Sequence, residues 1–171
     1  MAYLRKGVIN NSNILYPKGH VIQTIFNEST ASTSITSTTA GSPTSTGLTC
    51  AITPKVAGSK ILGLINIHLQ LQAHTTSVAD AGVTIKVNDG SSYIYVDGGE
   101  AHMGLYTYGG SGDPGDEIRI RYPTQFYIAA SNTTARTYTV YAWLWPSSNT
   151  PTCNVSVNSS KSQFTLMEIS D

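Results

Sequence analysis

The sequence predicts an all-β protein, a two-sheet sandwich of the jelly-roll type with an extended amino-terminal arm. Apolar and polar residues alternate in short runs, and clusters of Gly, Pro, Asn, Asp and Ser separate these runs. No segment repeats its apolar residues at helical spacing. Alternating strands without helices bury their apolar sides sheet against sheet, so a sandwich follows.

Residues 1–19 are predicted to form a docking arm, because the alternation begins only at His20 and residues 20–171 then form the sandwich domain. An arm that carries apolar anchors in free solution needs a partner surface. The expected anchors are Tyr3, Leu4, Arg5, Lys6, Ile14, Leu15 and Tyr16.

The first strands follow in order along the chain. Residues 21–26 form one run, and the Ser/Thr-rich residues 29–47 predict a long loop or a weak edge strand. Residues 48–52 alternate again and end before Pro54. Residues 60–72 give the strongest strand, with one face made by Ile61, Ile65, Ile67, Leu69 and Leu71.

A hairpin and a long loop come next. Residues 83–87 and 92–96 flank Asn88-Asp89-Gly90, whose residue types tolerate the positive φ of a tight turn. The Gly-rich residues 97–116 predict a second long loop, either a flexible exposed segment or a contact loop. Tyr offers contact area and Gly adapts around it, so the candidate contact residues are Tyr106, Tyr108, Gly109 and Gly110.

The remaining strands are predicted at residues 117–122, 124–130, 137–145, 152–157 and 163–169. Within residues 137–145, Tyr138, Val140, Ala142 and Leu144 share one face, which we expect in the core with Ile65, Ile67 and Leu69. The opposite face carries Tyr141, Trp143 and Trp145, and we expect it to form a subunit interface.

Charge excludes some partners. Ten Lys and Arg balance ten Asp and Glu in 171 residues, so the formal net charge is zero and no basic face for nucleic acid is expected. The chain has no apolar stretch of about 18 residues and no signal-peptide pattern, so no membrane partner and synthesis in a cytoplasm are expected. Near-zero net charge also permits self-association.

No reactive constellation stands out, so we expect no enzyme activity, no cofactor and no metal site. The histidines lack metal-ligand spacing, and the carboxylates of the loops form no ordered pair. Cys50 and Cys153 occupy strand-like positions and are interpreted as buried small hydrophobic residues rather than a disulfide.

Several segments resemble one family. Residues 48–54, Leu-Thr-Cys-Ala-Ile-Thr-Pro, are followed after a spacer by residues 59–65, Ser-Lys-Ile-Leu-Gly-Leu-Ile. With residues 137–140 and 162–169, they resemble small virion structural proteins of tailed, cyanophage-type bacteriophages, over the chain from Val21 to its end. That family is similar in layout to trimeric jelly rolls of the tumour-necrosis-factor-like kind. Trp143, Trp145 and the two cysteines depart from its pattern.

The resemblance implies a homotrimeric capsid decoration, or cement, protein on the outer capsid surface of a virion, synthesised in the host bacterial cytoplasm. Its partners would be its own copies and neighbouring subunits of the major capsid protein. The alternative is a short tail fibre or receptor-binding tip, with tail proteins and a host surface glycan as partners and residues 29–47 and 97–116 at the contact. A virion-associated polysaccharide hydrolase is disfavoured by the missing carboxylate pair.

Overall fold

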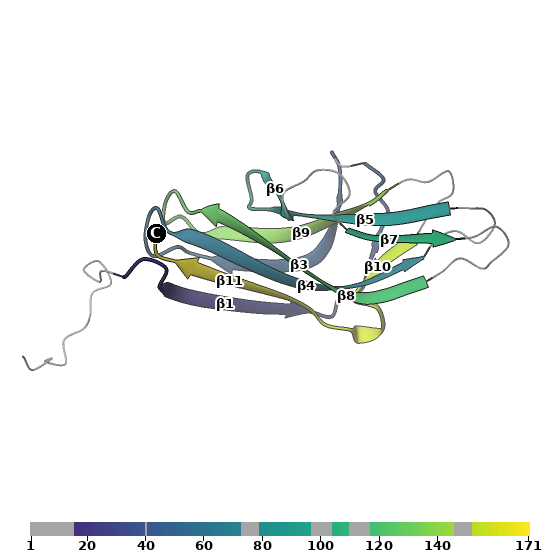
Figure 1. The fold of residues 1–171 in the computed structure, drawn as a ribbon, viewed down its shortest axis with the longest axis horizontal. Helices are drawn as coiled ribbons and strands as arrows, with labels where there is room; N and C mark the ends of the chain where they lie inside the picture. The colour runs from purple at the N-terminus through teal and green to yellow at the C-terminus, as the bar shows by residue number, and fades with distance from the viewer. Residues whose placement is uncertain (1–15, 40, 73–78, 97–103, 110–116, 146–151) are drawn as a thin grey trace, which may run out of the picture.

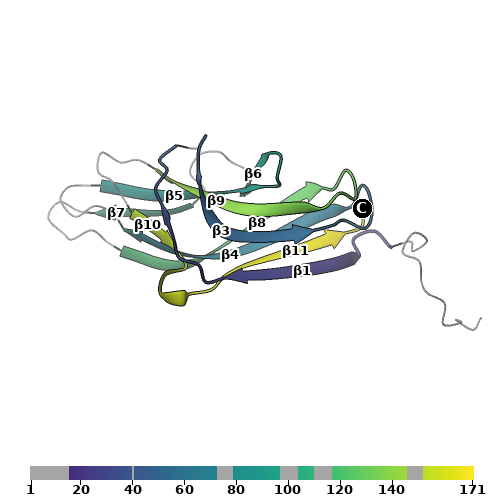
Figure 2. The ribbon, with the colours of Figure 1, turned by 180° about the vertical axis from the view of Figure 1, so that it is seen from behind.

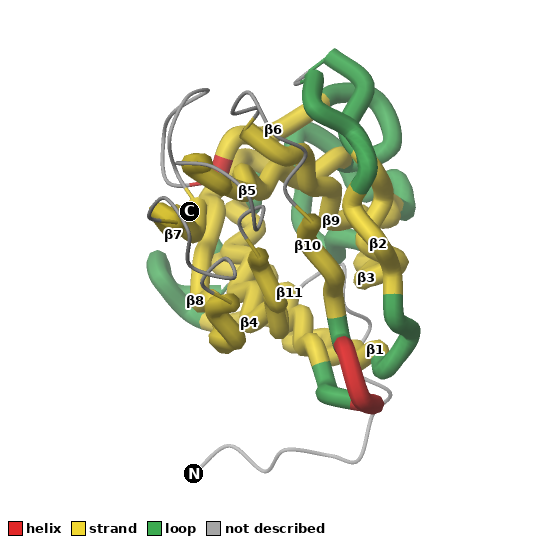
Figure 3. The backbone as a smooth tube through the Cα atoms, turned by 90° about the vertical axis from the view of Figure 1, so that its right-hand side faces the viewer, coloured by secondary structure: helices red, strands yellow, loops and turns green. Residues whose placement is uncertain are grey.

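The described residues form a two-layer β-sandwich, which confirms the all-β jelly-roll prediction (Figures 1 and 3). The computed structural model describes residues 16–39, 41–72, 79–96, 104–109, 117–145 and 152–171. All strand pairings among them are antiparallel.

One layer, sheet A, is six-stranded, with the order β1-β11-β4-β10-β2 and with β8 also paired to β4. Its strands are β1 (Val21–Ser29), β2 (Thr33–Ile35), β4 (Lys60–Gln72), β8 (Glu117–Ala129), β10 (Thr152–Val155) and β11 (Ser162–Ile169). The other layer, sheet B, is five-stranded, with the order β3-β9-β5-β6 and with β7 paired to β5. Its strands are β3 (Thr44–Ile52), β5 (Ala79–Asn88), β6 (Tyr93–Tyr95), β7 (Gly104–Gly109) and β9 (Arg136–Trp145).

The core confirms the predicted facing of the two main strands. Ile65, Ile67 and Leu69 of β4 and Val140 and Leu144 of β9 are all buried between the sheets. Their alternation with polar residues is what directs one side of each strand inward. The hydrophobic side of each sheet therefore lies against the other, as in other sandwiches.

Aromatic rings fill one part of this core. Phe126 stacks on Tyr138 with ring centroids 5.3 Å apart and meets Phe164 edge-on at 6.1 Å. Gly63 of β4 makes room for this ring, since a Cβ there would lie 2.1 Å from Phe126 Cε1. The glycine is thus required by close packing between neighbouring strands.

The edge of β4 opposite β8 is shared by two strands that follow each other in sequence. β11 pairs with residues 60–66 and β10 with residues 69–72. Between them the chain leaves the ladder as an excursion, residues 156–161, which holds the 3-10 turn η3 (Val157–Ser159) and positive φ at Ser156, Asn158 and Ser159. The Oγ atoms of Ser156 and Ser162 lie 2.8 Å apart and close the excursion beside His68.

Three sequence expectations change in detail. Residues 104–109, expected within a loop, form β7 and pair with β5. The runs 117–122 and 124–130 form one strand, β8, which pairs with β4 on one side only. Pro123 has no backbone N–H, and it is tolerated because the unpaired side of the strand needs no hydrogen-bond donor. The Ser/Thr-rich residues 29–47, expected to be a long loop or a weak edge strand, contain the short edge strand β2 and, from Thr44, the first residues of β3.

The two cysteines are free and buried, as predicted. Cys50 lies in sheet B and Cys153 in sheet A. Burial raises the pKa of the Cys153 thiol to about 12, and burial is also the main cause that raises the pKa of Cys50. Neither thiol is therefore prepared to act as a nucleophile at neutral pH.

The base of the predicted arm is fixed to the carboxyl end of the chain (Figure 2). Gly19 N–H donates to the Ser170 carbonyl at 2.9 Å, and Ser170 N–H donates to the His20 carbonyl at 2.9 Å. Tyr16 stacks on His20 with ring centroids 5.6 Å apart. Residues 16–20 are therefore part of the folded body.

A buried carboxylate holds the adjoining connection between β3 and β4. Glu168 of β11 is fully buried and accepts hydrogen bonds from the backbone N–H groups of Lys55 and Val56, each at 2.9 Å. Gln23 Nε2 and Ser59 Oγ donate to it at 2.6 and 2.9 Å. Burial alone would raise the pKa of Glu168, but these donors outweigh it and hold that pKa below its ordinary value.

Candidate functional site

The most unusual surface of the described chain is the outer face of sheet A, the side turned away from sheet B. Side chains alternate along a strand, so the outer side of β4 carries every second residue. These residues are Lys60, Leu62, Leu64, Asn66, His68, Gln70 and Gln72. Lys60, at the start of the strand, is ion-paired with Asp171. Leu62 and Leu64 are apolar and the residues from Asn66 onward are polar, which divides the rest of the face into two halves.

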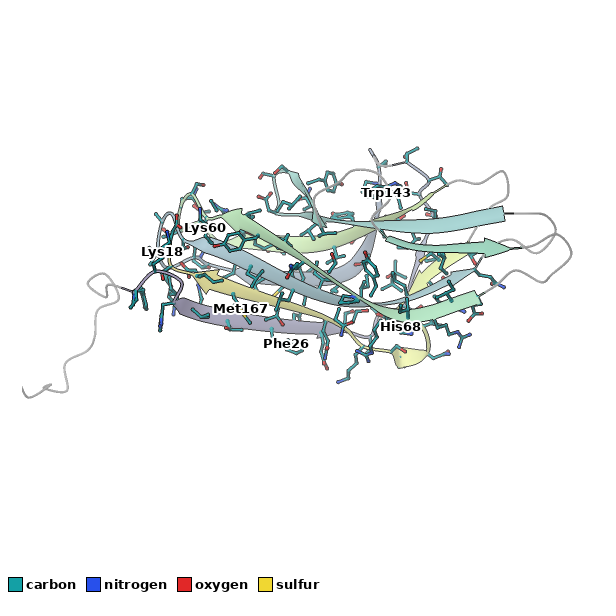
Figure 4. The ribbon with its side chains drawn as sticks, in the orientation of Figure 1. Lys18, Phe26, Lys60, His68, Trp143 and Met167 are labelled. Atoms are coloured by element: carbon teal, nitrogen blue, oxygen red, sulfur yellow. The ribbon has the colours of Figure 1, made fainter. Side chains whose placement is uncertain are left out.

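The apolar half consists of two rows that cross β1, β11, β4 and β8. The strand register places Thr24, Met167, Leu62 and Tyr127 in one row and Phe26, Thr165, Leu64 and Gln125 in the next. We call these residues the uncharged rows, because none of their side chains carries a charge. Phe26 is 55%, Tyr127 58% and Leu64 36% exposed, and Figure 4 places Phe26 and Met167 on this side.

An open hollow of about 400 Å³ marks the boundary between the halves. It is lined by Leu64, Ile65, Asn66, Pro123, Thr124 and Gln125 of β4 and β8. The face is thus not flat, and a side chain from another molecule has a recess to enter.

In the polar half, the strand register places His68 opposite Arg121, Gln70 opposite Arg119, and Gln72 opposite Glu117. Burial, followed by the Arg121 and Arg119 guanidinium groups, lowers the pKa of His68, so His68 is neutral at neutral pH. Hydrogen bonds from Arg119 and then Gln70 hold the pKa of Glu117 below its ordinary value. Arg121 forms no ion pair with the described carboxylates.

Chemically, this face offers contact area and hydrogen-bonding groups. The carboxylates described in the polar half, Glu117 and Glu28, are ion-paired with Arg119 and Lys161. Across the described residues, no group of three or more His, Cys, Asp or Glu side chains could hold a metal ion. The arrangement suits recognition of another molecule through surface rather than bond making or breaking.

The predicted aromatic interface on β9 needs correction at Trp143. This side chain is only 5% exposed in the single chain, so it is not an exposed apolar group that needs a partner. The segment after β2 approaches this end of β9, where Leu144 N–H donates to the Ser37 carbonyl at 2.8 Å. Tyr141 is half-buried and meets Tyr93 edge-on at 5.5 Å, while the side chain of Trp145 lies outside the described part.

The other candidate residues are only partly described. Tyr106, Tyr108 and Gly109 belong to strand β7 and not to a loop, and Gly110 lies outside the described residues. Their paired backbone reduces the freedom expected of an adaptable contact loop. Of the arm residues, only Tyr16 is described; Tyr3, Leu4, Arg5, Lys6, Ile14 and Leu15 are outside the described ranges.

Sequence reasoning missed the uncharged rows. It described only the inward face of residues 60–72, whereas Leu62 and Leu64 lie on the opposite face. These two leucines were the one sign in the sequence that part of the outer face is apolar. Phe26, Met167 and Tyr127 could not be added to them without the strand order, because the three residues come from different strands.

Comparison with known proteins adds a likeness of fold. No family model and no curated protein matches the chain. A similar solved structure is the CBM22-1 xylan-binding domain of Paenibacillus barcinonensis Xyn10C, at 9% identity and a TM-score of 0.33, covering 92% of this chain and 99% of that one. Another is a mutant VP2 protein of infectious bursal disease virus, at 8% identity and a TM-score of 0.31, covering 98% of this chain and 41% of that one.

These similarities are too distant to indicate what the chain binds. The two antiparallel sheets by themselves define the class, a jelly-roll β-sandwich. None of the helices in the described part is long and apolar enough to cross a membrane.

Proposed function

We propose that the protein is a virion structural protein, a homotrimeric capsid decoration protein that clamps neighbouring subunits of the major capsid protein on the outer capsid surface. The observation that carries this proposal is the exposed, uncharged surface across β1, β11, β4 and β8. Three exposed apolar side chains on one face, Phe26, Leu64 and Tyr127, suit protein–protein contact. A cement protein acts through such contact area and needs no reactive groups.

The two ends of the sandwich support a division of tasks. The base of the arm, at residues 16–20, lies beside the carboxyl end of the chain at one end of the molecule (Figure 1). At the opposite end, β4 and β9 finish and β5 and β8 begin (Figure 1). An arm leaving the first end could grip the shell while the second end faces solvent.

A short tail fibre or receptor-binding tip is the second candidate. The polar half of sheet A favours it, since the amides of Gln70 and Gln72 and the Arg121 guanidinium are groups that hydrogen-bond sugar hydroxyls. In that case the partners would be tail proteins and a host surface glycan.

The decisive experiment adds purified protein to phage shells from which this protein has been stripped. The capsid proposal expects saturable co-sedimentation, with density on the outer shell in images of the reconstituted particles. Density at the tail alone would replace it with the fibre assignment. The absence of binding to either structure would contradict a virion role.

A further inference from the structure

We propose that a hollow between the β5–β6 turn and the β8–β9 connection binds a neutral saccharide through its hydroxyl groups. The hollow has a volume of about 460 Å³. Its lining includes Asp89 and Ser91 of the turn, Ile128 near the end of β8, and Ser131, Asn132 and Arg136 beyond it. None of the residues that line it belongs to the uncharged rows, so the inference goes beyond the capsid contact proposed above and does not depend on it.

The first step is a pair of opposite charges that share the hollow. Asp89 and Arg136 both line it, yet no ion pair joins them in the described chain. Burial alone would raise the pKa of Asp89, but hydrogen bonds from Ser92 and Ser91 and the Arg136 charge hold that pKa below its ordinary value. An anion would meet the Asp89 charge and a cation the Arg136 charge, so these walls favour a ligand without net charge.

The second step is an unused acceptor on Asp89. The carboxylate accepts from Ser91 N–H at 3.0 Å, from Ser91 Oγ at 2.8 Å and from Ser92 N–H at 2.9 Å, each time through Oδ1. Its other oxygen, Oδ2, accepts no hydrogen bond from any described residue. One atom of Asp89 therefore holds the turn, and the other is available to a ligand.

The third step is an unused donor on Asn132. Its Oδ1 accepts from Thr134 N–H at 3.0 Å and from Arg136 Nη2 at 3.1 Å, whereas its Nδ2 has no partner among the described residues. The hollow thus offers a carboxylate oxygen that accepts and an amide group that donates. A sugar hydroxyl both donates and accepts, and neighbouring hydroxyls on one ring can serve both groups at once.

The shape of the hollow agrees with this chemistry. Pockets for small molecules have volumes of about 300–1,000 Å³, and the hollow lies within that range. Ile128 is half-buried and supplies apolar contact for the C–H groups of a sugar ring. Most of the other lining side chains are polar, as a ligand covered with hydroxyl groups requires.

Both walls are held in place without a ligand. Arg136 Nη2 donates to Ser131 Oγ at 3.2 Å as well as to Asn132 Oδ1, which ties the β8–β9 connection to the start of β9. Ala130 N–H donates to the Ser59 carbonyl at 2.7 Å and fixes the end of β8. A preformed site loses less entropy when it binds, so a small ligand is sufficient.

The experiment measures binding of trisaccharides of glucose, galactose and mannose to the intact protein by saturation-transfer difference NMR. At least one of them should bind saturably, with a dissociation constant of about 1 mM, as suits an open hollow. Inorganic phosphate and glycine serve as charged competitors and should not displace it. Displacement by either one would assign the hollow to a charged ligand and overturn the inference.

Two variants test the unused atoms and leave the bonded ones in place. Asp89→Asn keeps the Oδ1 acceptor of the turn and replaces Oδ2, and Asn132→Asp keeps Oδ1 and replaces the Nδ2 donor. Each should weaken saccharide binding by about tenfold or more, because one polar group of the site then faces a mismatched partner.

Asn154→Asp on β10 is the matched control. It makes the same change of charge as Asn132→Asp and keeps the Oδ1 atom that accepts from Ser34 Oγ, but it lies outside the hollow. It should bind saccharide like the wild type, and circular dichroism should show all three variants folded. Unchanged binding by both hollow variants, or no binding of any trisaccharide to the wild type, would overturn the inference. Co-sedimentation with capsid shells should be the same for all of them, so the proposed function is tested separately.

Discussion

At the scale of single residues, Glu168 shows how a buried charge can support this fold. Its carboxylate accepts hydrogen bonds from two separate segments: from Gln23 on β1, and from Lys55, Val56 and Ser59 in the connection between β3 and β4. Removing the charge would weaken all of these hydrogen bonds, because a neutral oxygen is a poorer acceptor than a carboxylate. A buried carboxylate with this many donors stabilises the ionised state, which is why its pKa is depressed.

Glu168→Gln should lower the free energy of unfolding at neutral pH by about 1–3 kcal/mol, because an NH₂ group in place of Oε2 cannot accept from Gln23 Nε2 or Lys55 N–H, and the remaining oxygen is uncharged. Since the folded-state pKa is lowered, the wild-type contribution is present above the unfolded-state pKa and is lost as pH falls through the folded-state pKa. Denaturant unfolding across pH should therefore show the two proteins converging in acid. A difference that stays constant with pH would show that the carboxylate charge does not matter.

Gly63→Ala tests the close packing of β4 and β8. A Cβ at Gly63 would lie 2.1 Å from Phe126, a ring held between Tyr138 and Phe164 that has little room to move. Overpacking should cost about 1–3 kcal/mol in denaturant unfolding. Gly41→Ala is the control, since nothing lies within 4 Å of a Cβ there. Equal stability of both variants would mean that the ring relocates freely.

At the scale of elements, β4 organises the molecule, since it pairs with β8 along its whole length and with β10 and β11 on its other edge. Ile67 lies at its centre and is fully buried. Ile67→Ala should cost about 2–5 kcal/mol through lost transfer energy and a cavity. An unchanged denaturant midpoint would contradict this central role.

The sequence predicted elements well where alternation was strong. β4 has the predicted bounds, and the hairpin of β5 and β6 has the predicted turn, in which the side chain of Asp89 accepts from the N–H groups of Ser91 and Ser92. β7 was missed because glycines surround a short run of strand-forming residues, Leu105 to Tyr108. Its pairing with β5 is a tertiary contact that composition does not reveal.

The candidate site was harder to predict than the fold. Period-two patterning assigned two sides to β9 but could not say which other segment would cover Trp143. Likewise, Phe26 and Tyr127 share a face only because β11 and β4 lie between their strands. Which side chains share a surface depends on strand order, and strand order is a property of the whole chain.

At the scale of the whole molecule, removal of residues 1–15 should leave the sandwich folded and trimeric but abolish binding to capsid shells. The described body begins at Tyr16, whose ring already stacks on His20, so the cut spares every described contact. Most binding energy should come from the apolar anchors, because the exposed ion pairs available to Arg5 and Lys6 add only about 0–1 kcal/mol each.

The measurement is co-sedimentation with stripped shells. A control that replaces Tyr3 and Leu4 with Ser should lose most of the binding, while replacement of Arg5 and Lys6 with Gln should lose little. Full shell occupancy by the truncated protein would rule out the arm as the anchor.

The excursion between β10 and β11 has a consequence for engineering. Its two ends are already side by side, with the Oγ atoms of Ser156 and Ser162 2.8 Å apart, and the strands on either side keep their pairing with β4. Additional residues between Asn158 and Ser159 would need no change of register, and closing a longer loop costs little entropy. A peptide epitope inserted there would therefore be displayed on every copy of the protein, at one fixed place on the folded body.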